Sequence, residues 1–124
     1  MIYLDKTTRK LQMVLAGAVA ANQLQCVVYL HDVWAQSKTW NEDYKGAIQV
    51  STSNNTTDVD ICNAPGVNGT TRDVSHISIY NADTGNVTVT VKMDDGGTEH
   101  ILVKQQLLTT ESLVYEHGMG WQVL

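Results

Sequence analysis

The sequence predicts an all-β fold, an antiparallel sandwich or barrel, and three features indicate it. Residues 76–93 alternate apolar and polar side chains, and successive side chains of a strand point to opposite faces. Asn, Asp and Gly, which adopt turn geometry readily, interrupt these alternating runs. Toward the C-terminus the runs recur about every ten residues, which is the spacing of short strands in sandwiches and barrels.

The second half of the chain has the clearest strand pattern. Ile77 and Ile79 share one face of the first run, and Val87 and Val89 share one face of the next. The polar segment 81–86 favours a chain reversal between them. Further strands are expected, in order, at 99–108, 111–118 and 120–124.

The middle of the chain predicts further strands and a loop. Val59 and Ile61 are expected to face the core from a short strand, while Asp58 and Asp60 face solvent. The other expected elements here are a strand at 46–53 and a loop at 64–73, which contains the only proline.

Residues 10–34 are apolar without a clean period. The alanines of 16–22 would allow a helix, whereas Gly17 and the valine-rich run 26–34 favour extended structure. We therefore expect a strand, a bend of small residues at 16–22, and a second strand. This apolar surface exceeds what one edge of a small barrel needs, so the sequence predicts that residues 1–34 form an extended arm buried against another subunit.

The candidate binding residues lie in this arm and in the loop expected at 35–46. Trp40 and Tyr44 stand among polar residues in that loop, where contact with a ligand or partner is as well supported as core filling in a chain without Phe. The expected organisation is an arm with the first strands over residues 1–34 and a β-sandwich or barrel over 35–124. The residues expected to contact a partner are Leu11, Met13, Leu15, Val19, Leu24, Trp40 and Tyr44.

The histidines and cysteines show no pattern for a metal or a catalytic centre. No two histidines have the spacing of metal ligands, and His31 and Asp32, adjacent in a strand, should diverge to opposite faces. Cys26 and Cys62 form no metal motif and are expected to be buried free thiols, with a disulfide between them only if their strands are neighbours. The sequence therefore predicts no metal site here.

Two pairs of carboxylates remain, Asp58 with Asp60 and Asp94 with Asp95. Such pairs can bind calcium or divide acid and base roles, but a solvated strand face and ordinary turn chemistry explain them more simply. The glycines also lack the spacing of a phosphate-binding loop. We expect no enzyme activity and no cofactor.

Charge and hydropathy exclude further classes of function. The net charge is −5, and the eight Lys and Arg residues are spread along the chain, which argues against binding of nucleic acid. The longest apolar run, at 13–21, is about half the length of a membrane span. With no targeting segment visible, we expect synthesis in a cytoplasm.

The stretches "ISIYNADTGNVTVTVKMDDGGTEHILVKQQL" and "ESLVYEHGMGWQVL" combine a strand ending in Asn, a V-T-V strand, a D-G-G-T turn, a K-x-x-L strand and a closing S-L-x-Y-x-x-G-x-G-W-x-V motif. This combination resembles a module found in virion proteins of tailed bacteriophages. The opening "LDKTTRKLQMVLAGAVAANQLQ" is similar to the N-terminal arm that precedes the module. Members usually carry Gly before the E-S-L strand, where this chain has Thr109 and Thr110. The matching positions are Ile79, Asn81, Val87, Thr88, Val89, Gly96, Gly97, Thr98, Lys104, Leu107, Ser112, Leu113, Tyr115, Gly118, Gly120, Trp121 and Val123.

The resemblance implies a jelly-roll-like barrel, a homotrimer and no active site. It implies a capsid decoration (cement) protein, made in the bacterial host and located on the outer surface of the assembled head. There it would clamp neighbouring major capsid protein subunits, without contacting nucleic acid or membrane. The alternative is a tail or head-fibre component that binds a receptor, with Trp40 and Tyr44 meeting a host glycan. A binding module outside any virus is a further alternative.

Overall fold

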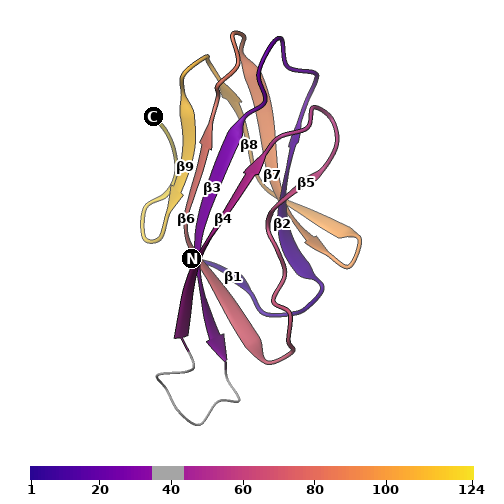
Figure 1. Ribbon diagram of the computed structural model, residues 1–124, viewed down its shortest axis with the longest axis vertical. Coiled ribbons are helices and arrows are strands. Elements are labelled where there is room, and N and C mark those ends of the chain that lie inside the picture. The colour runs from indigo at the N-terminus through magenta and orange to yellow at the C-terminus, as the bar shows by residue number, and fades with distance from the viewer. Residues whose placement is uncertain (35–43) are drawn as a thin grey trace.

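The computed structural model describes residues 1–34 and 44–124, which form two antiparallel β-sheets packed face to face (Figure 1). The predicted all-β sandwich is confirmed, while a jelly-roll arrangement within that class stays a prediction. The strands are β1 (Ile2–Leu4), β2 (Arg9–Leu15), β3 (Gln25–Trp34), β4 (Tyr44–Thr52), β5 (Val59–Cys62), β6 (Thr70–Tyr80), β7 (Val87–Asp95), β8 (Thr98–Leu107), β9 (Ser112–Glu116) and β10 (Gly120–Val123).

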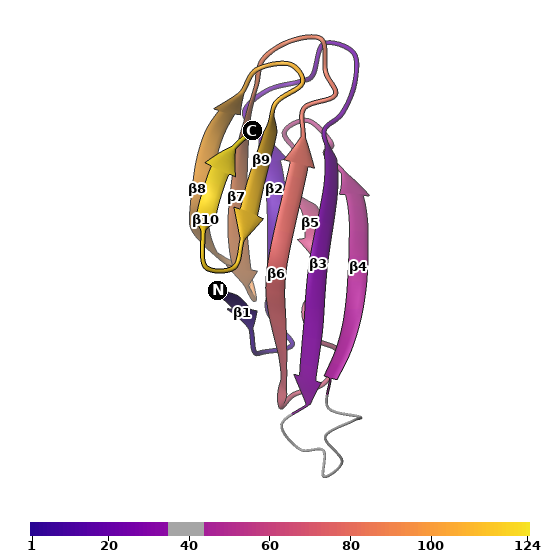
Figure 2. The same ribbon diagram turned by 90° about the vertical axis from the view of Figure 1, so that its left-hand side faces the viewer.

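The six-stranded sheet has the order β10-β9-β6-β3-β4, and β1 pairs with β6 (Figure 2). The four-stranded sheet has the order β5-β2-β7-β8. In each of three hairpins, β3–β4, β7–β8 and β9–β10, both strands belong to the same sheet. Every other pair of consecutive strands is divided between the two sheets. In the β7–β8 hairpin Gly96 and Gly97 have φ angles of 61° and 103°, which glycine adopts more readily than other residues.

The core lies between the two sheets and is filled by the predicted alternating residues. Ile77 and Ile79 of β6 and Val89 and Val91 of β7 are fully buried. From β5, Ile61 is fully buried and Val59 packs against the core, as expected. The remaining fully buried large side chains are Leu4, Leu11, Met13, Leu24, Val28, Val74, Leu107 and Leu113.

The prediction that the N-terminal arm is left for another subunit to cover is wrong. β2 lies between β5 and β7 in the four-stranded sheet, so its inner face is part of the protein's own core. Leu11 and Met13 are fully buried, Leu15 is 2% exposed and Leu24 is fully buried. Val19 is partly buried and packs against the same core. The apolar excess of residues 1–34 is explained by strands contributed to both sheets, and β3 is an interior strand of the larger one.

The strand, bend and second strand predicted for residues 10–34 are confirmed, and the bend is hydrogen-bonded to the rest of the domain. The carboxylate of Asp83 accepts hydrogen bonds from the backbone N–H groups of Ala20, Ala21 and Asn22, at 2.8, 2.7 and 3.0 Å. These hydrogen bonds stabilise the charged carboxylate and lower the pKa of Asp83 to about 2. This connection therefore holds the β2–β3 bend against the β6–β7 turn.

Two predicted boundaries differ from the structure. The loop expected at 64–73 ends earlier, because β6 already begins at Thr70 and Arg72 pairs with Leu4 of β1. The Arg72 guanidinium also donates to both oxygens of Asp32, at 2.7 and 2.9 Å, which supports this end of the strand. Tyr44, expected in a loop, is the first residue of β4.

Candidate functional site

The strand β4 places its apolar side chains outside the sandwich. The register sets Gln49 opposite Val28 and Ser51 opposite Cys26, and both β3 residues point into the core. Ile48 and Val50 therefore project from the outer face of the sheet, where they are 61% and 70% exposed. A half-buried strand normally has the reverse arrangement, with apolar residues inside.

Exposed apolar residues continue from β4 onto the neighbouring strands. Ile48 lies beside Tyr29 of β3, which lies beside His76 of β6. Two residues further along β4, Val50 lies beside Val27 of β3. Figure 2 looks onto this side of the sheet. The apolar face, as we call it, consists of Val27, Tyr29, Ile48, Val50, His76 and Tyr80.

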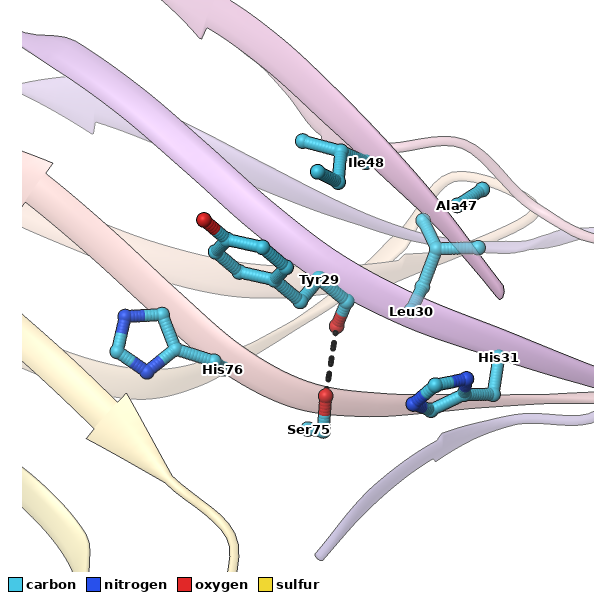
Figure 3. A pocket seen from close by; sticks show the side chains of 7 residues that line it. All are labelled: Tyr29, Leu30, His31, Ala47, Ile48, Ser75 and His76. Atoms are coloured by element: carbon cyan, nitrogen blue, oxygen red, sulfur yellow. Dashed lines mark hydrogen bonds between the residues drawn. The ribbon is translucent and has the colours of Figure 1, made fainter.

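An open depression of about 670 Å³ lies on the apolar face (Figure 3). The Tyr29 ring stands beside the His76 ring, with centroids 5.4 Å apart and planes inclined at 75°, an edge-to-face contact. Ile48 and Ala47 line the β4 side. The hydroxyl of Ser75, at the bulge in β6, donates to the Tyr29 carbonyl oxygen at 3.3 Å. The depression is thus built on paired strands.

Titratable side chains lie near the rim of the apolar face. His76 Nδ1 is 3.4 Å from Glu116 Oε1 of β9. On β6, burial raises the pKa of Asp73, while the charges of the nearby His31 and His117 oppose this rise. The rim therefore combines acidic and imidazole groups around an apolar centre.

The outer face of the four-stranded sheet is different, because several of its charged side chains form ion pairs with one another. The Lys92 ammonium group of β7 is 2.8 Å from Asp58 and 2.8 Å from Glu99, and the residue is only 6% exposed. Asp60 is 3.1 Å from Lys10 and accepts a hydrogen bond of 2.8 Å from the Gln12 amide. The carboxylates of Asp58 and Asp60 thus serve ion pairs on a strand face.

The two cysteine side chains are buried inside the protein. Burial raises the pKa of Cys26 to about 12 and that of Cys62 to about 11, so both are buried, protonated thiols, and the prediction of free cysteines is confirmed. Within residues 1–34 and 44–124, no group of three or more His, Cys, Asp and Glu side chains is arranged to hold a metal ion. The same residues contain no helical segment that could cross a membrane.

The residues predicted to contact a partner do not form a common exposed surface in the described part of the chain. Leu11, Met13, Leu15 and Leu24 face the protein's own core, so they are withdrawn as contact residues. Trp40 and the side chain of Tyr44 lie outside the described residues. Sequence reasoning missed Tyr29, Ile48 and Val50. One signal was present, because the run 26–30 is apolar at both odd and even positions, which indicates a strand covered on both faces.

Comparison with known proteins adds no relative: no family model, curated protein or solved structure matches the chain. The resemblance of residues 77–124 to a phage virion module therefore stays a prediction from the sequence. The function has to be argued from the surface of the molecule and from that resemblance.

Proposed function

We propose that this chain is a non-catalytic binding module that attaches to a protein assembly through the apolar face. In its specific form, the proposal is that the assembly is the head of a tailed bacteriophage. The chain would then be a decoration protein on the outer surface of the head, in contact with the major capsid protein.

The observation that carries the proposal is the reversed orientation of β4. Ile48 and Val50 are exposed while Gln49 and Ser51 point inward, so these apolar side chains contribute little to the core. Monomeric proteins rarely expose contiguous apolar surface without a use for it, and such surface marks interaction sites. Burial of these side chains by a partner would be favourable, at roughly 25 cal/mol per Å² of apolar area.

The resemblance supports the specific form of the proposal, and the arm does not. Residues 77–124 carry the module-like motifs, and the apolar face reaches this segment at Tyr80 of β6. The clamp by an apolar N-terminal arm is no longer part of the proposal, because those side chains are buried inside the sandwich. Attachment is assigned to the sheet surface instead.

A matched pair of substitutions tests the attachment surface. Ile48→Ser changes the apolar face, and Ile101→Ser makes the same change at a residue of similar exposure, 68%, on β8 of the other sheet. The purified protein should bind expanded empty heads of its own phage and raise their melting temperature. Loss of a well-buried interface side chain should weaken binding about tenfold or more for Ile48→Ser, with no change for Ile101→Ser. Failure of the unmodified protein to bind would exclude the phage-head form of the proposal, and equal losses in both variants would exclude attachment through the apolar face.

The depression on the apolar face favours a second candidate, a receptor-binding component of a tail or fibre. An exposed tyrosine ring beside an imidazole can contact the ring of a sugar while its hydroxyl forms a hydrogen bond. If this candidate holds, Tyr29→Ala should abolish adsorption of the phage to host cells and leave head stability unchanged. Unchanged adsorption would count against it.

A further inference from the structure

The strand β4 forms a sheet edge that lacks the usual protection against pairing. It is nine residues long and pairs with β3 in one continuous register without a bulge. Residues 46–52 contain neither a charged residue nor proline. Natural proteins usually protect an edge strand by shortness, charge, proline or a bulge, because an open edge pairs readily with another strand.

The other sheet edges carry such protection. β10 and β5 have four residues each. β8 is longer, but its pairing with β7 shifts between Val91 and Lys92, and its exposed residues include Glu99 and Lys104. Among the strands that the structure describes, β4 is thus the long edge without a bulge or a central charge.

The backbone groups that point away from this edge can be identified. Ser53 N–H donates to the Leu24 carbonyl oxygen at 2.9 Å, which marks these opposite residues as a hydrogen-bonded pair. In an antiparallel ladder such pairs alternate with non-bonded pairs. Gln49 and Ser51 therefore bond to β3, whereas the N–H and C=O groups of Ile48, Val50 and Thr52 point outward from the edge.

We propose that this edge pairs with β4 of a second copy of the chain, antiparallel, about a twofold axis at Gln49. In this register Ile48 lies opposite Val50 of the second copy, and their outward N–H and C=O groups form the new ladder. Gln49 lies opposite itself, and Ala47 lies opposite Ser51. The two six-stranded sheets become one continuous sheet.

The occupant is a second copy because this edge is complementary to itself. Apolar side chains meet across the strands on the outer face and polar side chains meet on the inner face, an arrangement that stabilises neighbouring strands. Residues 46–52, which form this ladder, carry no charged side chain, so no like charges meet within it. A twofold pair is also the commonest closed assembly of identical chains.

The pairing does not depend on the attachment proposed above, because it uses backbone groups of the edge. It would nevertheless place two apolar faces side by side on one sheet. Two linked binding surfaces attach to a repeated assembly more strongly than one surface alone, provided that both can reach their sites.

Two proline substitutions test the pairing by sedimentation equilibrium. The unmodified protein should have twice the mass of the chain. Val50→Pro removes an N–H group that points outward, so it should give a folded monomer with an unchanged circular dichroism spectrum. Gln49→Pro removes a ladder hydrogen bond to β3 and should unfold or strongly destabilise the protein. An unmodified protein with the mass of one chain, or of the trimer that the sequence resemblance implies, would overturn the proposal. A Val50→Pro protein that remains dimeric would overturn it as well.

A cross-linking pair keeps the proposal testable if Val50→Pro does not fold. Gln49→Cys places two thiols opposite each other at the axis, in a non-bonded pair whose spacing suits a disulfide. Thr52→Cys is the control, because position 52 lies opposite position 46 of the second copy. Oxidised glutathione should link Gln49→Cys chains to each other and leave Thr52→Cys chains unlinked. No linkage at position 49, or equal linkage at both positions, would contradict the register. Ile48→Ser reports on attachment, whereas these variants report on mass, so the two proposals can fail separately.

Discussion

The strands β2 and β4 both alternate apolar and polar side chains, yet they point them in opposite directions. In β2, Leu11 and Met13 are fully buried. In β4, Ile48 and Val50 are mostly exposed. β2 has a strand on each side and faces the other sheet, whereas β4 is an edge strand. Alternation thus shows that the two faces of a strand differ, while the position of the strand in the sandwich decides what each face contacts.

The outer sides of these two strands differ as well. Outside β2, Lys10 and Gln12 both contact Asp60, so the polar groups have partners within the protein. Outside β4, Val50 lies beside Val27 and Ile48 beside Tyr29, so the surface offers apolar area instead. The polar groups of the first surface are satisfied while that surface faces water. Burial of the second surface by a partner would lower the free energy of the system.

The largest expected effect is on β2, where Met13→Ala should destabilise the protein strongly. Met13 is fully buried between the sheets, and truncation of a buried large side chain to Ala reduces the free energy of unfolding by about 2–5 kcal/mol. Urea denaturation followed by circular dichroism measures the change.

The control for this prediction is Val14→Ala, which changes the next residue of β2 on its outer, half-buried side. Its effect should be about 1 kcal/mol or less, because it removes only partly buried methyl groups. If both substitutions had the same small effect, β2 would not form part of the core, and the arm would again be available to a partner.

A smaller effect is expected for Lys92→Met, on the outer face of the four-stranded sheet. The substitution keeps an apolar stem and leaves Asp58 and Glu99 without their cation. Because both carboxylates are partly exposed, at 39% and 45%, the loss should be about 1–2 kcal/mol, between the values of surface and buried ion pairs. Thermal denaturation of the two proteins side by side measures it.

The pH dependence of this difference identifies the charge as its cause. Burial opposes the charge of Lys92, but the hydrogen bonds to Asp58 and Glu99 outweigh it, so the pKa of Lys92 is raised. A raised lysine pKa stabilises the fold below the unfolded pKa of about 10.4, and the contribution disappears as pH rises through the folded pKa. The difference in melting temperature should therefore be constant from neutral pH to about pH 9 and shrink above the lysine pKa. A difference that persists there would indicate lost packing instead.

The sequence was sufficient to predict the fold class and insufficient to predict the apolar face, for one physical reason. In β6 and β7 the apolar residues Ile77 and Val89 face the core as predicted, because interior strands of a sandwich have one buried side. For β4 the same rule would place Ile48 and Val50 inside and Gln49 outside, which is the reverse of the structure. Whether a strand lies at an edge depends on pairing between distant segments, and local pattern does not contain it. The same missing information made residues 1–34 resemble an uncovered arm.

The smallest expected effect on stability is at β4, where Val50→Ser should change the free energy of unfolding by about 0.5 kcal/mol or less. Val50 is 70% exposed, so the methyl groups that are removed contact water more than the core. The matched control is Val89→Ser in β7, the same chemical change at a fully buried residue. There the lost apolar contacts and a buried hydroxyl should together reduce the free energy of unfolding by about 2–4 kcal/mol. Urea titrations of both variants measure the contrast. Equal losses would mean that Val50 supports the core, and the reversed strand would then be explained by stability instead of binding.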